Sequence, residues 1–152
     1  GGGKGTLLTK KGHNNIQFLT FSSKTFAIPP LSSETTKFLS LPLPPGLKIE
    51  ISIDQLKGTI DENSGEVLLQ FESQFTFSMG AILKFPSLIV KTLLKTGKVK
   101  GTSHEAEGLV LQNNGKTKLV GIAMIPLTGN KILDAFLGLP NEALAELPCE
   151  IK

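Results

Sequence analysis

The sequence predicts a mainly β (α+β) fold, a curved antiparallel sheet or partly open β-barrel with short helices packed on it or plugging it. Three observations predict this class. Glycine and proline are frequent while charged residues make up only 19% of the chain, a mix that favours strands and turns over long solvated helices. Several segments alternate apolar and polar residues, as half-buried strands do. A twelve-residue segment occurs twice, which indicates duplicated hairpin-helix units.

One domain is expected, because 152 residues can bury a complete hydrophobic core without metal or disulfides. Residues 1–5 are predicted to be a flexible leader or a cloning scar, and residues 6–152 the β-rich domain. No apolar run approaches the ~20 residues of a spanning helix, and the start lacks a signal-peptide pattern. A soluble chain is therefore expected, and its compartment stays unknown.

The N-terminal region predicts a hairpin followed by a short helix. Its strands are expected over residues 6–10 and 16–27, before Pro29 and Pro30 end the second one. Residues 32–39 then offer a helix cap and one apolar helical turn.

The next region predicts two long strands. Residues 47–53 alternate strictly, so one face should be buried and the other wet. The cluster at residues 61–65 has the composition of a hairpin turn. The strand after it carries an aromatic stripe that Ser73 interrupts; the stripe consists of Phe71, Phe75 and Phe77.

The repeat relates Lys57–Leu68 to Lys100–Leu111, with seven of the twelve residues identical. It predicts two copies of a strand, turn, strand and helix unit, over approximately residues 56–97 and 99–140. The helices are expected at residues 87–95 and 130–137, the first ended by Gly97.

The second copy should contain a tight hairpin, because Asn114-Gly115 is the strongest type I′ turn signal in the chain. A two-residue turn there would place Ala106 opposite Ala123. The other face of that hairpin would carry Ile122 and Met124 together with Glu105 and Glu107. Another helical turn is expected over residues 141–147, before a short final strand that begins at Cys149.

Composition argues against several functions. The sixteen basic residues are all lysine, and without arginine, tyrosine or tryptophan a nucleic-acid partner is not expected. His104-Glu105-Ala106-Glu107 is not a zinc motif, because no second histidine follows. No G-x-S-x-G elbow or phosphate loop occurs, so the sequence predicts no metal, cofactor or catalytic residue. The hypothesis that the protein is an enzyme would be favoured only if His104 and Glu107 lay in one cleft.

The first functional hypothesis is a non-catalytic binding domain for a hydrophobic small molecule such as a lipid or pigment. Apolar strands under short helices are a usual setting for an apolar pocket. Glu105 or Glu107 would anchor a polar group of the ligand. The predicted lining residues are Phe71, Phe75, Phe77, Ile122 and Met124. In outline the strand pattern is similar to lipocalin-like and YceI-like barrels, and it matches no family motif.

The second hypothesis is a scaffold or assembly factor. It would dock the predicted helix at residues 87–95 on an acidic protein partner or an anionic membrane surface. The rim of this helix is predicted to consist of Lys84, Lys91, Lys95 and Lys98. Salt should weaken this docking steeply and leave pocket binding almost unchanged.

Overall fold

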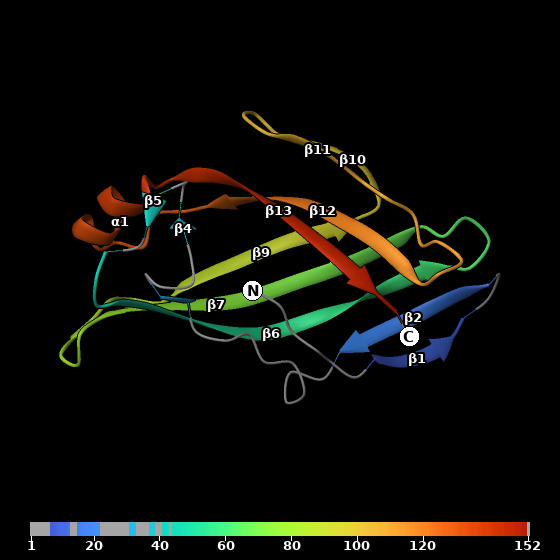
Figure 1. The fold of residues 1–152 in the computed structure, drawn as a ribbon, viewed down its shortest axis with the longest axis horizontal. Coiled ribbons are helices and arrows are strands. Elements are labelled where there is room, and N and C mark those ends of the chain that lie inside the picture. The colour runs from blue at the N-terminus through green and yellow to red at the C-terminus, as the bar shows by residue number, and fades with distance from the viewer. Residues whose placement is uncertain are drawn as a thin grey trace.

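The computed structural model describes residues 7–12, 15–21, 31–32, 37–38, 41–42 and 44–151. Within them one antiparallel sheet dominates, with the strand order β1-β2-β6-β7-β9-β12-β13 (Figure 1). Its seven main strands are β1 (Leu7–Lys11), β2 (Ile16–Phe21), β6 (Leu47–Asp61), β7 (Val67–Met79), β9 (Leu88–Lys95), β12 (Lys116–Ile125) and β13 (Asn141–Glu150). The short strands β3 (Leu31–Ser32) and β8 (Leu83–Lys84) pair with β6 and β7.

Two small hairpins and one helix complete the described structure. The strands β4 (Lys37–Phe38) and β5 (Leu41–Pro42) pair with each other, as do β10 (Gly97–Lys100) and β11 (Glu105–Gly108). The helix α1 (Lys131–Leu137) lies at one end of the sheet (Figure 1). No helix in the described part of the chain is long and apolar enough to span a membrane.

The sheet curls into a half-barrel, which confirms the predicted fold class. Leu19 of β2 and Leu147 of β13 belong to one apolar cluster, although four strands separate β2 from β13 in the sheet order. Such a contact requires the sheet to bend back on itself. β6 contributes to the bend with a bulge between Ile53 and Gln55, where its register with β7 shifts.

The concave face carries two buried apolar clusters. The first contains Leu19, Ile53, Leu56, Ile60, Val67, Leu69, Leu94 and Leu119. The second lies beneath α1 and contains Leu47, Ile49, Phe77, Leu88, Leu133 and Leu137. Strand alternation explains why the members from β6 and β7 share this face, because every second side chain of each strand points to it.

The helix predicted at residues 87–95 is wrong, because this segment is β9. It pairs with β7 over eight residues, from Phe75 opposite Leu88 to Leu68 opposite Lys95. β9 is a central strand between β7 and β12, so apolar residues are tolerated on both of its faces. A short run that is apolar on both sides cannot be distinguished from a helix by its periodicity.

The predicted pairing within the second copy is also wrong. β11 pairs with β10 and only the single bridge between Leu109 and Lys118 continues toward β12, whereas Ala123 lies opposite Ala143 of β13. The turn itself is where it was expected, with Gly115 at φ 80°, but it closes between Gln112 and Lys116. This longer loop changes the register that a two-residue turn would impose.

In the C-terminal region, one predicted helix is confirmed and one predicted helical turn is wrong. The helix at residues 131–137 is confirmed: the Asn130 side chain accepts hydrogen bonds from two amides of the first turn, and Gly138 ends the helix at φ 66°. The helical turn expected over residues 141–147 is wrong, because the ten residues of β13 pair with β12 throughout.

Near the N-terminus, the first predicted strand overlaps β1, and β2 covers residues 16–21 of the second. Residues 31–32 and 37–38 are short strands, where part of a helix was expected. The predicted leader and residues 22–27 and 33–36 lie outside the described residues.

Candidate functional site

The middle of the concave face carries an unusual polar atom. Ser73 of β7 is fully buried, and its Oγ has no hydrogen-bond partner among the described residues. The side chains of Phe71 and Phe75, two positions away on either side, share its face of the strand and are half-buried. A buried hydroxyl without a partner costs about 1–3 kcal/mol, so Ser73 calls for an explanation.

Ser73 lies where the two apolar clusters meet. Its register partners are Ile53 of β6, in the first cluster, and Val90 of β9, which packs against the second. The β6 bulge begins at Ile53, directly beside Ser73. Bulges frequently accompany functional sites because they redirect neighbouring side chains.

The C-terminal strands present small side chains to the same concave face. Gly121 and Ala123 of β12 pair with Ala145 and Ala143 of β13, and paired residues share a face of the sheet. A side chain at Gly121 would meet the Leu93 carbonyl oxygen at 2.6 Å, which explains why only glycine fits there. The concave centre therefore combines aromatic side chains on β7 with small side chains on β12 and β13.

The structure divides the predicted ligand-binding residues between the two faces of the sheet. Phe71, Phe75 and Phe77 lie on the concave face, where Phe77 is a buried core residue beneath α1. Ile122 and Met124 alternate with Ala123 and therefore lie on the convex face. Met124 is 66% exposed. The five residues therefore do not line a single binding site.

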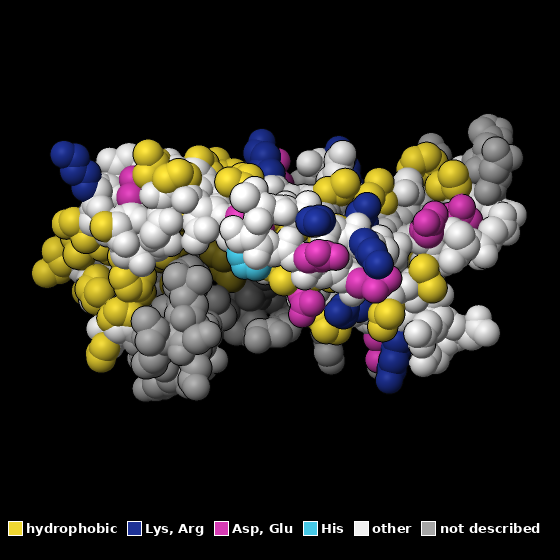
Figure 2. Space-filling view, turned by 90° about the horizontal axis from the view of Figure 1, so that it is seen from above, with side chains coloured by type: hydrophobic (Ala, Val, Ile, Leu, Met, Phe, Trp, Pro, Cys, Tyr) yellow, Lys and Arg dark blue, Asp and Glu magenta, His cyan; other side chains and the backbone are white. Residues whose placement is uncertain are grey.

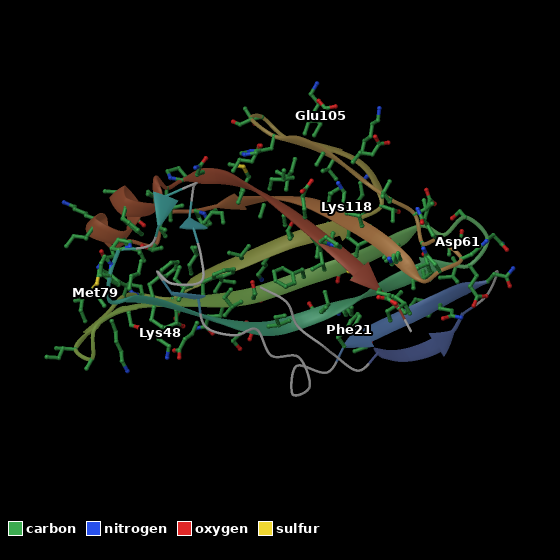
Figure 3. The ribbon with its side chains drawn as sticks, in the orientation of Figure 1. Phe21, Lys48, Asp61, Met79, Glu105 and Lys118 are labelled. Atoms are coloured by element: carbon green, nitrogen blue, oxygen red, sulfur yellow. The ribbon has the colours of Figure 1, made fainter. Side chains whose placement is uncertain are left out.

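The predicted carboxylate anchors lie outside the concave face as well. Glu105 and Glu107 are exposed on β11, opposite Lys100 and Lys98 of β10. Figure 3 shows Glu105 on the hairpin that stands away from the sheet. This β10–β11 hairpin lies over the convex side, where Val120 of β12 is completely buried.

The four predicted partner-binding lysines do not form one rim. Lys84 lies in β8, opposite Ser78 of β7, and Lys95 ends β9. The ammonium group of Lys91 is 3.4 Å from the Glu72 carboxylate across β7 and β9. Lys98 lies opposite Glu107 in the hairpin. Their predicted proximity depended on a helix that is not formed.

A second polar site, which the sequence analysis missed, joins the β10–β11 hairpin to the main sheet. The carboxylate of Glu142, at the start of β13, accepts hydrogen bonds from the amides of Thr102 at 2.6 Å and Ser103 at 3.0 Å. It also lies 2.9 Å from His104 Nδ1. Burial raises the pKa of Glu142, but these hydrogen bonds lower it by more, so the pKa lies below the ordinary 4.5.

This site serves to hold the hairpin. A side chain at Gly101 would overlap the Glu142 carboxylate, so the glycine lets the turn wrap closely around it. Among the described residues, the hydrogen bond of the His104 ring is to this carboxylate and none joins it to a hydroxyl or thiol. His104 and Glu107 therefore do not form the catalytic pair that an enzyme would need.

The other potentially reactive side chains among the described residues form neither a metal site nor an activated nucleophile. No group of three or more histidine, cysteine, aspartate or glutamate side chains there could hold a metal ion. Cys149 of β13 packs against the first cluster, and burial raises the pKa of its thiol. A raised pKa keeps the thiol protonated and weakly nucleophilic.

Two open hollows, of about 500 and 340 Å³, lie away from the concave centre. One lies beside the Gln112–Lys116 turn and the end of β13, and the other beside Asp61 and Thr96. Neither is lined by any of the predicted ligand-binding residues.

No protein-family model matches the chain, and no curated protein or solved structure matches it either.

Proposed function

We propose that this chain is a non-catalytic binding protein for a hydrophobic small molecule, held on the concave face of the half-barrel. The observation that carries the proposal is the buried hydroxyl of Ser73, which has no partner in the described part of the chain and lies between the half-buried rings of Phe71 and Phe75. Protein atoms cover this hydroxyl in the structure, so a ligand would reach it by displacing them, and its hydrogen bond would then remove the cost of leaving the hydroxyl unpaired.

The surroundings define the class of ligand. Glu72, next to Ser73 in β7, pairs on the convex face with Lys91, next to the Ser73 partner Val90 in β9. The concave centre therefore favours an uncharged, mainly apolar molecule with one polar group, such as a hydroxyl, carbonyl or ester. Aromatic side chains supply most of the contact area that such a molecule would bury.

The test is a fluorescence titration with N-phenyl-1-naphthylamine, an uncharged apolar probe. Replacing both Phe71 and Phe75 by alanine should weaken probe binding by about tenfold or more, because each lost ring removes over 1 kcal/mol of apolar contact. The matched control is Met124→Ala on the convex face, which should bind as the unchanged protein does. Equal affinity in all three proteins, each folded by circular dichroism, contradicts the proposal.

Ser73→Ala separates the polar contribution from the apolar one. The only polar group of the probe is an aromatic amine N–H, a weak hydrogen-bond donor, so its affinity should change less in this variant than that of an alcohol. An apolar alcohol used as competitor should displace the probe several-fold less well from Ser73→Ala, because a typical hydrogen bond contributes about 1 kcal/mol. Equal competition in both proteins would remove Ser73 from the site.

The scaffold or assembly-factor hypothesis keeps less support. Its docking element was the helix at residues 87–95, which is the strand β9, and its lysines are spread over β8, β9 and β10.

A further inference from the structure

The α1 end of the molecule exposes a group of large apolar side chains. Figure 2 shows hydrophobic side chains gathered at this end, whereas charged side chains of both signs alternate toward the other. Ile82 at the tip of the β7–β8 hairpin is 96% exposed, and Ile132 of α1 is 73% exposed. The apolar end, as defined here, consists of Ile82, Leu83, Leu127, Ile132 and Phe136.

The helix at this end is apolar on both sides. Leu133 and Leu137 are buried in the cluster beneath it, while Ile132 and Phe136 face solvent. A helix on the surface of a soluble domain normally directs polar residues outward. The outward side of α1 is therefore suited to a second apolar environment.

The β7–β8 hairpin supports its apolar tip firmly. Ser78 pairs with Lys84, and the Phe85 amide donates a 3.0 Å hydrogen bond to the Phe77 carbonyl oxygen at the base of the hairpin. Gly80 adopts φ 60° in the turn, which lets the chain reverse just before Ile82. Figure 3 places Met79, at the end of β7, at this end of the molecule.

Positive charge borders these apolar side chains. Lys84 follows Leu83, Lys131 precedes Ile132, and neither ammonium group lies within ion-pairing distance of a described carboxylate. Two described carboxylates of this region are already engaged. Glu50 pairs with Lys48 at 2.7 Å, and Asp134 accepts hydrogen bonds from Thr128 and Gly129.

We propose that the apolar end docks on the surface of an anionic phospholipid bilayer. Ile82, Ile132 and their neighbours enter the boundary between headgroups and acyl chains, and Lys84 and Lys131 contact lipid phosphates. Full burial of one such aliphatic side chain is worth about 1.5–3 kcal/mol, and each lysine near an anionic surface adds about 1 kcal/mol. Together these contributions suffice for reversible membrane attachment.

A bilayer fits this surface better than a protein partner. The five apolar side chains come from three separate segments, a hairpin tip, a loop and a helix. A fluid interface accommodates separate projecting side chains, whereas a protein partner requires a complementary surface. This proposal stands independently of the ligand on the concave face.

The test is flotation with two kinds of vesicle, phosphatidylcholine alone and phosphatidylcholine mixed with phosphatidylserine. The unchanged protein should float with the mixed vesicles. The double variant Ile82→Ser/Ile132→Ser should bind them at least about tenfold more weakly. Its matched control is Leu93→Ser/Leu109→Ser, which alters two exposed leucines away from the apolar end and should bind as the unchanged protein does.

The lysines are tested with the same vesicles. The variant Lys84→Gln/Lys131→Gln should bind mixed vesicles several-fold more weakly, and its binding should depend less on added salt. The control variant Lys98→Gln/Lys116→Gln has the same change of charge elsewhere on the molecule and should bind as the unchanged protein does. The proposal is overturned if the unchanged protein does not float with the mixed vesicles. It is also overturned if both serine double variants lose vesicle binding to the same extent. Self-association that Ile82→Ser/Ile132→Ser abolishes, without vesicle binding, would instead assign the surface to a second copy of the chain.

Discussion

The two copies of the repeated segment share seven of twelve residues and have different structures. In Lys57–Leu68 the end of β6 leads through a turn into the start of β7. In Lys100–Leu111 the turn comes earlier, and the residues equivalent to the first turn form β11. Further along the chain, the strand β9 follows the first copy, whereas the helix α1 occupies the equivalent place after the second copy. Identical residues therefore take their structure from the surfaces against which they pack.

The repeated glycines show this dependence directly. A side chain at Gly58 would overlap the carbonyl oxygen of Leu68 on the neighbouring strand, and one at Gly101 would overlap the carboxylate of Glu142. Backbone within a central pair of strands cannot move without breaking ladder hydrogen bonds, whereas a carboxylate can rotate away.

The largest expected effect comes from placing alanine at each of these glycines. Gly58→Ala should lower the free energy of unfolding by about 3 kcal/mol or more, because it forces β6 and β7 apart. Gly101→Ala should leave global unfolding within about 1 kcal/mol and release the β10–β11 hairpin, because it displaces only a side chain. Urea denaturation measures the first effect and amide hydrogen exchange the second. Equal loss of stability in both variants contradicts the comparison.

The repeated valines give the next largest difference. Val67 is 2% exposed in the first cluster, whereas its equivalent Val110 is 45% exposed. Val67→Ala should therefore cost about 1–3 kcal/mol of unfolding free energy and Val110→Ala less than about 0.5 kcal/mol. Thermal denaturation of the two variants checks this order, and a reversed order would place the second copy in the core.

The smallest effect is a pH response confined to the second copy. The folded pKa of Glu142 lies below 4.5, so its contribution to hairpin attachment is complete above the unfolded pKa and is lost as pH falls through the folded value. The carboxyl carbon resonance of Glu142 should therefore titrate with a midpoint below pH 4.5, and the amide resonances of Thr102 and Ser103 should shift in the same step. Glu142→Gln should abolish this titration. A midpoint above 4.5 contradicts the hydrogen-bonded carboxylate.

Alternation predicted most of the sheet from the sequence. Residues 47–53 and 67–77 are strands because their apolar side chains recur at every second position. The helix α1 was predicted as the equivalent, in the second copy, of a helix expected at residues 87–95, and only the second of these helices forms. The strand β9 was missed because its two faces are both partly apolar. Its environment as a central strand is set by β7 and β12, which local sequence does not specify.

The candidate site was predicted only in part. Phe71 and Phe75 lie at its centre, and Ser73 was visible in the sequence as the interruption of an aromatic stripe. Ile122 and Met124 were assigned to the same lining because a wrong hairpin register was assumed. The contacts of Glu142 join residues about 40 positions apart, and no local pattern marks them.

The central claim is that the concave face holds a hydrophobic small molecule. The most direct test is native mass spectrometry of the protein purified from its own source, followed by denaturing extraction and identification of any released compound. The account predicts a stoichiometric, uncharged, mainly apolar molecule whose retention is reduced by Phe71→Ala/Phe75→Ala and not by Met124→Ala. Protein that is bare at its monomer mass, or a compound retained equally by both variants, would contradict it.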